Sequence, residues 1–288
     1  MKTFSHIPVL LKESIEALKV KKGGKFIDAT AGGGGHTGKI IEKGGKVLAI
    51  DCDLDAIEIL KERFGVSAVI VNGNFSDIEL IASRNDFLTV NGIFFDLGVS
   101  SYQLDCSGRG FSIRHDEKLD MRMDLATETT ALDVVNKYPK SLLTEIFYRF
   151  GEEHNAEKIA IAIVEERKKR QIETTRQLAE IIEKIGHKSE RMHPATRVFQ
   201  AIRIEVNQEL EAIRKALEGA VRILDSEGRI VVISFHSLED RIVKKLFDIF
   251  QKQGLGKIIT KKPIVPSESE KNANRRSRSA KMRVFEKI

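Results

Sequence analysis

Cysteine is scarce in this chain, which has only Cys52 and Cys106 among its 288 residues. Two cysteines exclude a disulfide framework and a structural zinc site, and so low a number is typical of proteins in the reducing cytosol. The seven histidines are scattered and show no metal-ligand spacing. We therefore expect a cytoplasmic protein that holds no metal.

Long apolar runs are also missing. The longest, such as residues 229–235, are far too short to cross a bilayer, and residues 1–6 lack the apolar core of a signal peptide. No internal repeat is found. The remaining composition, 41% hydrophobic, is that of an ordinary globular protein. The sequence therefore predicts a globular protein without a membrane partner.

Positive charge exceeds negative charge by six. The excess is visible in residues 271–283, which hold six Lys or Arg side chains and no acid. Such a segment either contacts phosphate groups or forms a solvated tail, and the sequence leaves both interpretations open.

The first 110 residues alternate between strand and helix patterns. Short apolar strands are expected at 25–29, 47–50, 68–71 and 92–95, and helices at 36–43 and 55–64. Strands that alternate with helices predict a parallel sheet with helices on both faces. The fold class expected is therefore α/β and Rossmann-like.

The middle of the chain has helical periodicity almost throughout residues 132–223. Thr174 and Gln177 form the pattern of a capping box, Gly186 is expected to end that helix, and Pro194 suits the first turn of another. Strand patterns return afterwards. We expect a buried strand at 228–234, a helix at 238–250, and an antiparallel pair of strands at 257–260 and 282–285.

This order indicates one α/β domain interrupted by an all-helical insertion. The expected boundaries are 1–110 and 212–288 for the discontinuous α/β domain, and 111–211 for the insertion, which is of normal domain size. We expect the insertion to recognise the substrate.

A glycine-rich segment after the first strand is the first candidate binding site. Four glycines at residues 32–35 lead from the strand into a helix, so the backbone can approach a ligand closely. The spacing Gly33-x-Gly35-x-x-Gly38 also matches a dinucleotide fingerprint, which alone is a weak signal. The pattern predicts a nucleoside site at the carboxyl ends of the strands.

Acidic residues follow three of the predicted strands. Asp51 and Asp53 end the second strand, where an acid can accept both ribose hydroxyls. Asp28 ends the first strand and Asp96 the fourth. Carboxylates there would repel a pyrophosphate, whereas Asp28 can pair with the ammonium group of a methionine moiety. The acids therefore favour S-adenosylmethionine over NAD, although tight turns and helix caps would also explain such residues.

Phe75 follows the third strand and is a candidate to lie against the adenine, although a single phenylalanine there is more often part of the core. The segment 96–105 is the candidate for acceptor chemistry. Methyl transfer to an exocyclic amine needs an acceptor for its N–H groups, and Asp96 or the hydroxyl of Ser100 or Ser101 can serve. Cys106 has no evident activating partner, which argues against covalent attack on a pyrimidine ring.

Several motifs resemble the bacterial ribosomal RNA small subunit methyltransferase H family. They are Asp96–Asp105, Arg109–Ser112, Leu119–Asp124, His193–Asn207 and Ser234–Arg241, together with His6–Leu11. The resemblance runs almost from end to end. The loop Asp96-Leu97-Gly98-Val99 lacks the prolines that amino-methyltransferases usually carry after the fourth strand, and the family shares this departure.

The resemblance implies methyl transfer from S-adenosylmethionine to N4 of a cytidine in the decoding region of 16S ribosomal RNA. We expect this RNA to be the substrate within the assembled 30S subunit. It also implies the class I methyltransferase fold with a helical insertion. The cofactor contacts implied are Gly34, Gly35, His36, Asp51, Phe75, Asp96 and Gln103. Tyr102 stands where some relatives have proline, and its ring or hydroxyl is a candidate to touch the target base.

The sequence allows more than one interpretation of four residues, of the oligomeric state and of the function. Arg109, Arg197, Arg203 and His236 can act on the substrate or be structural. The oligomeric state is open, and a homodimer is one option. Two other functions compete with methyl transfer: an NAD-dependent oxidoreductase, against which Asp28 argues, and a ribosome assembly factor that keeps the cofactor pocket without catalysis.

Overall fold

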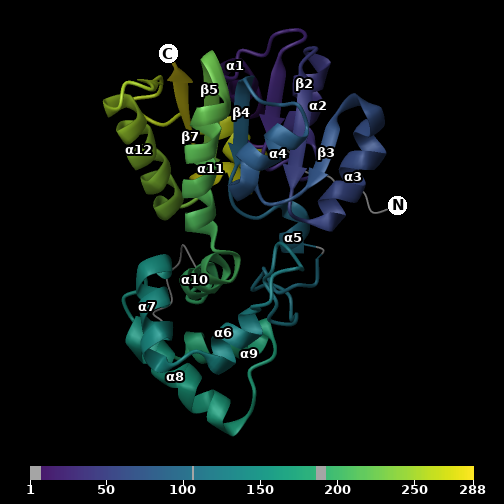
Figure 1. The fold of residues 1–288 in the computed structure, drawn as a ribbon. Coiled ribbons are helices and arrows are strands. Elements are labelled where there is room, and N and C mark those ends of the chain that lie inside the picture. Colours follow the sequence, from purple (N-terminus) through teal and green to yellow (C-terminus); the bar gives the residue numbers. More distant parts are fainter. Residues whose placement is uncertain (1–7, 106, 186–192) are drawn as a thin grey trace. The chain divides into compact units, whose positions relative to one another are not determined.

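The computed structural model describes residues 8–105, 107–185 and 193–288 (Figure 1). They group into two compact units, one built from the residues up to 98 together with 210–288, the other from residues 99–209. No helix within these described ranges has the length and apolar character needed to cross a membrane.

The first unit contains a seven-stranded sheet in the order β3-β2-β1-β4-β5-β7-β6. The strands are β1 (Lys25–Asp28), β2 (Lys46–Asp51), β3 (Val69–Asn72), β4 (Val90–Asp96), β5 (Leu224–Ser234), β6 (Gly256–Ile258) and β7 (Lys281–Lys287). The strands β1 to β5 run parallel, while β7 is antiparallel to both β5 and β6. The fold class expected from the sequence, a mostly parallel α/β sheet of Rossmann-like type, is confirmed.

Helices cover both faces of this sheet. They are α1 (Leu11–Ala17), α2 (Gly35–Glu42), α3 (Leu54–Phe64), α4 (Ile78–Arg84), α11 (Glu209–Ile223) and α12 (Ser237–Lys252), with α13 (Glu268–Ala273) near the C-terminus. Short 3-10 turns are η1 (Gly65–Ser67), η2 (Phe75–Asp77) and η3 (Arg275–Ser279). Side chains alternate across each strand, so neighbouring residues enter different cores. Phe95 packs with α4, α11 and α12, whereas Phe94 packs with α1, α2 and α3.

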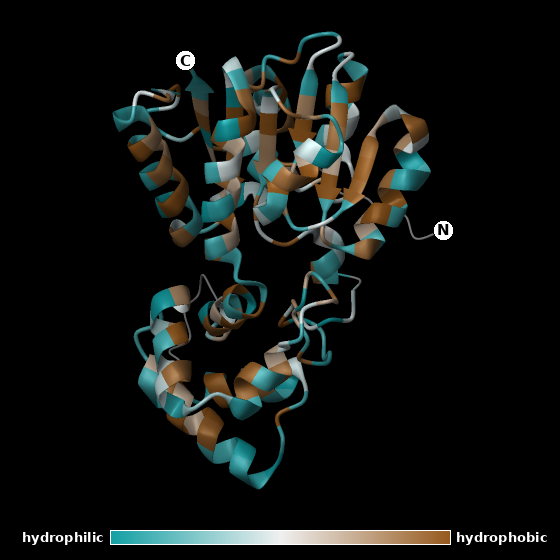
Figure 2. Ribbon diagram, viewed as in Figure 1, coloured by the Kyte–Doolittle hydropathy of each residue, from teal (hydrophilic) through white to brown (hydrophobic). Residues whose placement is uncertain are grey.

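The strands are hydrophobic over most of their length, as Figure 2 shows by their brown colour. This matches strands that are covered on both faces, which need apolar residues at every position. Polar residues stand instead at the carboxyl ends of β1, β2 and β4, which finish at Asp28, Asp51 and Asp96. Three central strands of the sheet therefore end in an acid at the same edge.

The second unit is helical. It contains α5 (Ser101–Asp105), α6 (Ala131–Lys137), α7 (Lys140–Gly151), α8 (Ala156–Lys169), α9 (Thr175–Glu183) and α10 (Thr196–Asn207). The predicted capping box is present, because the Thr174 side chain accepts from the backbone N–H of Gln177 while the Gln177 side chain accepts from that of Thr174. The expected helix end at Gly186 lies outside the described residues. Pro194 directly precedes the N-cap of α10 at Ala195.

The division between the units differs from the expected boundaries at residues 99–110, which group with the helical unit. Val99 and Leu104 pack against the core of that unit. The backbone N–H of Met121 donates to the carbonyl of Arg109 at 2.7 Å, which ties the segment to the same unit. The sequence could not place this boundary, since the segment has irregular structure up to α6 apart from the short α5.

Candidate active site

The glycine segment forms the turn between β1 and α2. Gly34 is the N-cap of α2 and has a φ of 77°, a left-handed conformation that glycine adopts at little cost. A Cβ at Gly34 would collide with the Phe64 ring and would lie 2.9 Å from Leu60 Cδ2. The carbonyl of Gly33 accepts a hydrogen bond from Arg63 of α3. The backbone of the turn at Gly33 and Gly34 therefore packs directly against α3, and a side chain at Gly34 would disrupt this packing.

The next glycine is equally confined. A Cβ at Gly35 would collide with the ring of Pro8. His36 follows in the first turn of α2, with its ring 4.1 Å from that of Phe94 between centroids. Its Nε2 lies 3.2 Å from the carbonyl oxygen of Val9, and its Nδ1 lies 4.0 Å from Asp96 Oδ2. The resemblance implied that His36 contacts the cofactor. In the structure Phe94 and the Val9 carbonyl hold its ring, and the ring lies beside Asp96.

Asp28 is held by a donor from α2, and Asp51 is held by backbone donors from the glycine turn and from the N-cap of α3. Asp28 accepts a 2.6 Å hydrogen bond from the Thr37 hydroxyl, and Asp51 accepts 2.8 Å and 2.9 Å bonds from the backbone N–H groups of Gly32 and Asp53. Burial raises the pKa of Asp28 to about 6, and it raises the pKa of Asp51 to about 6 as well. The two carboxylates repel each other, which adds to the shift of Asp28.

Asp96 differs from these two acids because one of its oxygens is unsatisfied. Its backbone N–H donates to Thr30 Oγ1 at 2.6 Å, which fixes the end of β4 against the β1 turn. Its Oδ1 is buried and has no hydrogen-bond partner among the described residues. Burial raises the pKa of Asp96 well above its usual value, and the charges of Asp28 and Glu239 raise it further.

A buried carboxylate oxygen without a donor is costly, so it points to a ligand that brings an N–H group or a positive charge. S-adenosylmethionine carries an ammonium group, a sulfonium and ribose hydroxyls, and an exocyclic base amine carries N–H donors. The acids Asp28, Asp51 and Asp96 together with the glycine turn therefore fit this cofactor. A pyrophosphate would meet three carboxylates at the same edge, which disfavours NAD.

Two other predicted cofactor residues also have structural partners. Asp53 caps α3, where its side chain accepts from the backbone N–H of Asp55 at 3.2 Å. The Phe75 ring meets Phe95 edge-on with 6.0 Å between centroids, and it packs against the core. For both residues the sequence already offered this structural alternative. Their contact with a nucleoside stays a prediction.

The segment after Asp96 enters the second unit, so its residues are described there and their part in the site stays a prediction. The backbone N–H of Ser100 donates to Gln103 Oε1 at 2.9 Å, and that of Gln103 donates to Ser100 Oγ at 3.2 Å. Tyr102 is half-buried in α5, which starts at Ser101. The Ser100–Gln103 pair thus fixes the start of that helix.

The four residues left open by the sequence all have partners inside the protein. Arg109 donates to the carbonyls of Arg122 and Met123, at 3.1 Å and 3.2 Å, and Arg197 donates to the carbonyl of Glu152 at 3.1 Å. Two guanidinium nitrogens of Arg203 donate to the carboxylate of Glu209 at 2.8 Å and 2.9 Å. These bonds support a structural role for the three arginines.

His236 is the N-cap of α12 at the carboxyl end of β5. The Glu239 side chain accepts from the backbone N–H groups of Phe235 and His236, at 2.7 Å and 3.2 Å, and His236 Nδ1 accepts from that of Glu239 at 3.4 Å. This reciprocal arrangement is a capping box built with histidine. It places the fully buried carboxylate of Glu239 where its charge acts on Asp96.

The sequence did not point to Thr30 or Thr37, and it indicated Glu239 only as part of a charged set, Glu239–Arg241, at the start of a helix. The two threonines flank the glycine segment, and a polar side chain at each end of a ligand-binding turn was an available signal. Glu239 stands three residues after His236, which is capping-box spacing, but histidine is not a usual partner in that motif. Its influence on Asp96 depends on the pairing of β4 with β5, which brings Asp96 opposite Ile233.

Comparison with known proteins identifies relatives along the whole chain. Residues 3–288 match the model of the MraW methylase family. Ribosomal RNA small subunit methyltransferase H of Sulfurihydrogenibium azorense is 49% identical, with 98% of this chain and 99% of that protein covered. The protein of the same name from Carboxydothermus hydrogenoformans is 48% identical, with 99% and 98% covered.

Among solved structures, a methyltransferase homolog from Pyrococcus horikoshii is 14% identical with a TM-score of 0.46, covering 98% of this chain and 68% of that one. The full-length family match and the two relatives near half identity are decisive, and they agree with the glycine turn and the acids of the sheet edge. The chain therefore belongs to the MraW methylase family, as an S-adenosylmethionine-dependent methyltransferase.

Proposed function

We propose that this protein methylates 16S ribosomal RNA, at the N4 exocyclic amine of a cytidine in the decoding region. Two relatives near half identity are named ribosomal RNA small subunit methyltransferase H, which supports ribosomal RNA of the small subunit as the substrate. The observation that supports an amine as the methyl acceptor is the buried Oδ1 of Asp96, which has no hydrogen-bond partner among the described residues. An amine N–H supplies the hydrogen bond that this oxygen lacks.

The cofactor site is assigned to one edge of the sheet. Asp28 holds the ammonium group, Asp51 receives the ribose hydroxyls, and the turn at Gly34 and Gly35 leaves the backbone open to close approach. Bound there, S-adenosylmethionine supplies an electrophilic methyl group on its sulfonium. The residues of the chain then have three tasks, which are to hold the base in line, to exclude water and to receive a proton.

Asp96 receives that proton. The lone pair of an exocyclic amine is delocalised into the ring, so the nitrogen becomes a better nucleophile when an acceptor takes hydrogen bonds from its N–H groups. As the carbon–nitrogen bond forms, the bond between the methyl carbon and the sulfur would break, which leaves a neutral thioether, and the amine proton would pass to Asp96 Oδ1. The raised pKa of Asp96 suits this task, because a carboxylate in its ordinary range is a weak base. Ser100, Ser101 and Tyr102 remain candidates for contact with the base.

The target base must leave any stack or pair before N4 is accessible. We propose that the helical unit, residues 99–209, recognises the RNA, and that the substrate is the assembled 30S particle in the cytoplasm. A factor that binds the ribosome without catalysis is the competing function. It predicts cofactor binding with no methyl transfer to 30S subunits or to a 16S transcript, whereas our proposal predicts transfer to the assembled particle.

Replacing Asp96 with Asn tests the proton acceptor. The change keeps the shape of the side chain but removes the base, so we expect methyl transfer to 30S subunits to fall by roughly 100-fold or more. Asp96→Ala should abolish transfer. Cofactor binding by calorimetry and the melting temperature show whether the variants remain folded and loaded. Asp86, an exposed acid that pairs with Lys25, provides the matched control, and Asp86→Asn should keep full activity. Full activity of Asp96→Asn would refute the assigned role.

A further inference from the structure

Positive charge is concentrated at the end of the chain. Residues 241–288 hold 14 Lys and Arg side chains against four Asp and Glu, a net charge of +10. The whole chain carries +6, so residues 1–240 are net negative by four. The excess of positive charge is therefore in residues 241–288, called here the basic C-terminal segment, which comprises most of α12 together with β6, α13, η3 and β7.

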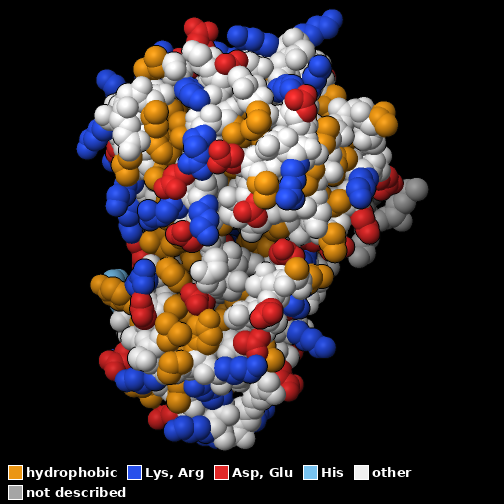
Figure 3. Space-filling view, viewed as in Figure 1, with side chains coloured by type: hydrophobic (Ala, Val, Ile, Leu, Met, Phe, Trp, Pro, Cys, Tyr) orange, Lys and Arg blue, Asp and Glu red, His pale blue; other side chains and the backbone are white. Residues whose placement is uncertain are grey.

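Some of these Lys and Arg side chains form ion pairs within the protein, and others do not. Lys257 pairs with Glu286 at 2.8 Å, and Arg283 pairs with Asp240 at 2.6 Å. A second group is exposed, and the side chains of its members have no ion pair or hydrogen bond with any described residue: Lys244, Lys245, Lys252, Lys261, Lys262, Arg275 and Arg278. Figure 3 shows Lys and Arg side chains gathered on the side of the molecule where α12 lies. Their charge is available to a partner.

The sheet register places part of this group at the edge that carries the acids. Lys281, the first residue of β7, pairs with Ser234 at the carboxyl end of β5. The turn η3, with Arg275 and Arg278, ends at Ser279, two residues before Lys281. Asp96 ends β4 opposite Ile233, one position from Ser234. The arginine turn therefore ends at the same sheet edge as the proposed proton acceptor.

This turn is held firmly although its arginines are exposed. Ser277 is fully buried, and its hydroxyl donates to the carbonyl of Asn274 at 2.8 Å. The backbone N–H of Arg276 donates to Asn274 Oδ1 at 3.2 Å, and that of Ala280 donates to the carbonyl of Ser277 at 2.9 Å. A buried serine between exposed arginines fixes the backbone that carries them, which lowers the entropic cost of binding.

A pocket of about 260 Å³ lies between α12, β6 with the residues after it, and β7. Its lining includes three cations, Lys244, Lys261 and Arg283, and one acid, Asp248, while Phe247 and Ile258 supply apolar surface. The bridge between Ile264 and Met282 brings the residues after β6 back toward the start of β7. A concave surface with two lysines suits a group that carries negative charge.

We propose that Arg275, Arg278, Lys244 and Lys261 form a phosphate-binding face for RNA next to the active-site edge. The inference rests on the proposed function, since it assigns the partner as the RNA that delivers the target base. Contacts to phosphates position the nucleic acid without reading its sequence, and they suit an enzyme whose specificity comes from one base held at Asp96. Arginine also donates two parallel hydrogen bonds to a phosphate, which fixes orientation.

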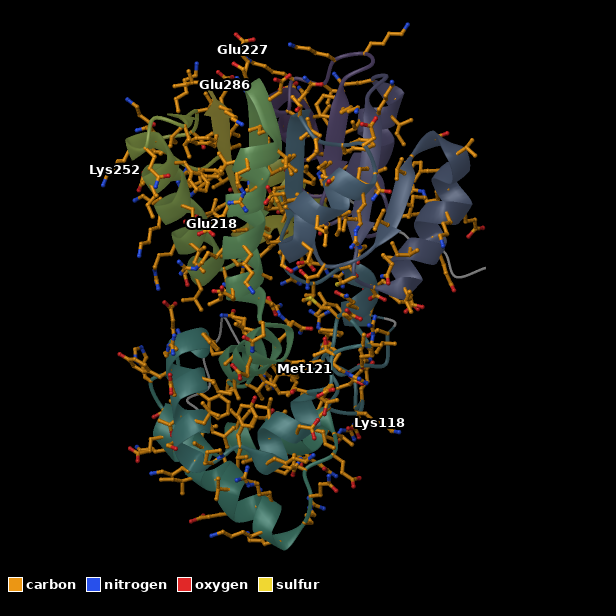
Figure 4. The ribbon with its side chains drawn as sticks, viewed as in Figure 1. Lys118, Met121, Glu218, Glu227, Lys252 and Glu286 are labelled. Atoms are coloured by element: carbon orange, nitrogen blue, oxygen red, sulfur yellow. The ribbon has the colours of Figure 1, made fainter. Side chains whose placement is uncertain are left out.

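The test compares two pairs of substitutions that each remove two positive charges. The test variant is Arg275→Ala with Arg278→Ala. The control is Lys22→Ala with Lys252→Ala, because Lys22 precedes β1 and Lys252 ends α12, away from the carboxyl ends of the strands. In Figure 4 the labelled Lys252 lies on the outer side of α12. The binding of a 16S ribosomal RNA transcript and of 30S subunits is measured at several salt concentrations.

We expect the test variant to bind the transcript about tenfold more weakly than the unmodified protein. A plot of log affinity against log salt concentration should have a slope that is smaller in magnitude by about two for the test variant, whereas the control should keep the slope of the unmodified protein. Cofactor binding by calorimetry should be equal in all three proteins. An unchanged affinity and slope for the transcript overturns the proposal, and a loss confined to 30S subunits does so too, because it points to an acidic protein surface. If the unmodified protein binds RNA through these residues but transfers no methyl group, the proposed function fails while the phosphate-binding face stands.

Discussion

Three buried carboxylates distinguish the candidate site at the scale of single residues. Asp28 and Asp51 have donors from the protein, whereas Asp96 Oδ1 has none among the described residues. The sequence predicted all three acids, because each follows a strand and parallel strands end at a common edge. It could not predict that Thr37 and Thr30 hold them, since those contacts depend on the path of the glycine turn.

The raised pKa of Asp28 should make the stability of the cofactor-free protein depend on pH. The unfolded chain releases this proton near pH 3.8, whereas the folded protein holds it until about pH 6. Between these values the folded state binds more protons, so its stability falls as the pH rises and stays low above pH 6. A shift of this size corresponds to about 3 kcal/mol at most.

Asp28→Asn removes this dependence, because its carbonyl can still accept from Thr37 but cannot ionise. We expect the free energy of unfolding of the variant, relative to the unmodified protein, to rise by about 2–3 kcal/mol between pH 4 and pH 7. Urea denaturation at the two pH values gives both numbers. A difference between the two proteins that is the same at both pH values would show that Asp28 is not destabilised by burial.

At the scale of elements, the β1–α2 turn depends on glycine for two separate reasons. Gly34→Ala places a Cβ at a left-handed residue, which costs about 1–2 kcal/mol, and it forces the Cβ against Phe64, which costs about 1–3 kcal/mol more. Gly23 has nearly the same φ, 78°, but a Cβ added there would meet no atom of the described residues within 4 Å apart from its chain neighbours. Gly23→Ala should therefore cost only the first amount. Equal losses in urea denaturation would contradict the tight packing of α2 against α3.

The cap of α12 should also set the proton affinity of Asp96. The charge of Glu239 raises the pKa of Asp96, so Glu239→Gln is expected to lower that pKa. Because Asp96 must be ionised to accept a proton, the acidic limb of the profile of kcat against pH should move to lower pH. Asp225→Asn, an acid at the opposite end of β5, is a suitable control. If kcat falls at every pH and the acidic limb of the profile stays at the same pH, the role of Glu239 is structural only.

Most elements of the α/β unit could be predicted from periodicity. The strands β1 to β4 and the helices α2 and α3 lie within two residues of their expected ends, because apolar runs and glycines mark them. The predicted antiparallel pairing of β6 with β7 is confirmed. The insertion of β7 between β5 and β6 was not predicted, since strand order depends on long-range packing. The extension of β5 back to Leu224 was missed because Gly228 is typical of a turn.

The whole molecule combines a sheet edge with three acids, a helical unit and a basic C-terminal segment. An α/β fold interrupted by helices was apparent from the order of the patterns alone. The placement of the basic segment was not, because only the register of β7 with β5 brings the arginine turn to the acidic edge. From the sequence alone, residues 271–283 could be interpreted either as a contact for phosphate groups or as a solvated tail.

Methyl transfer to one atom of one base is the activity that most needs a direct test. The direct measurement incubates the protein with isotopically labelled S-adenosylmethionine and 30S subunits, digests the RNA to nucleosides and identifies the labelled product by mass spectrometry. We predict label in N4-methylcytidine from the decoding region of 16S ribosomal RNA. Label on a different atom or in a different RNA, or no label while the cofactor is bound, would contradict the account.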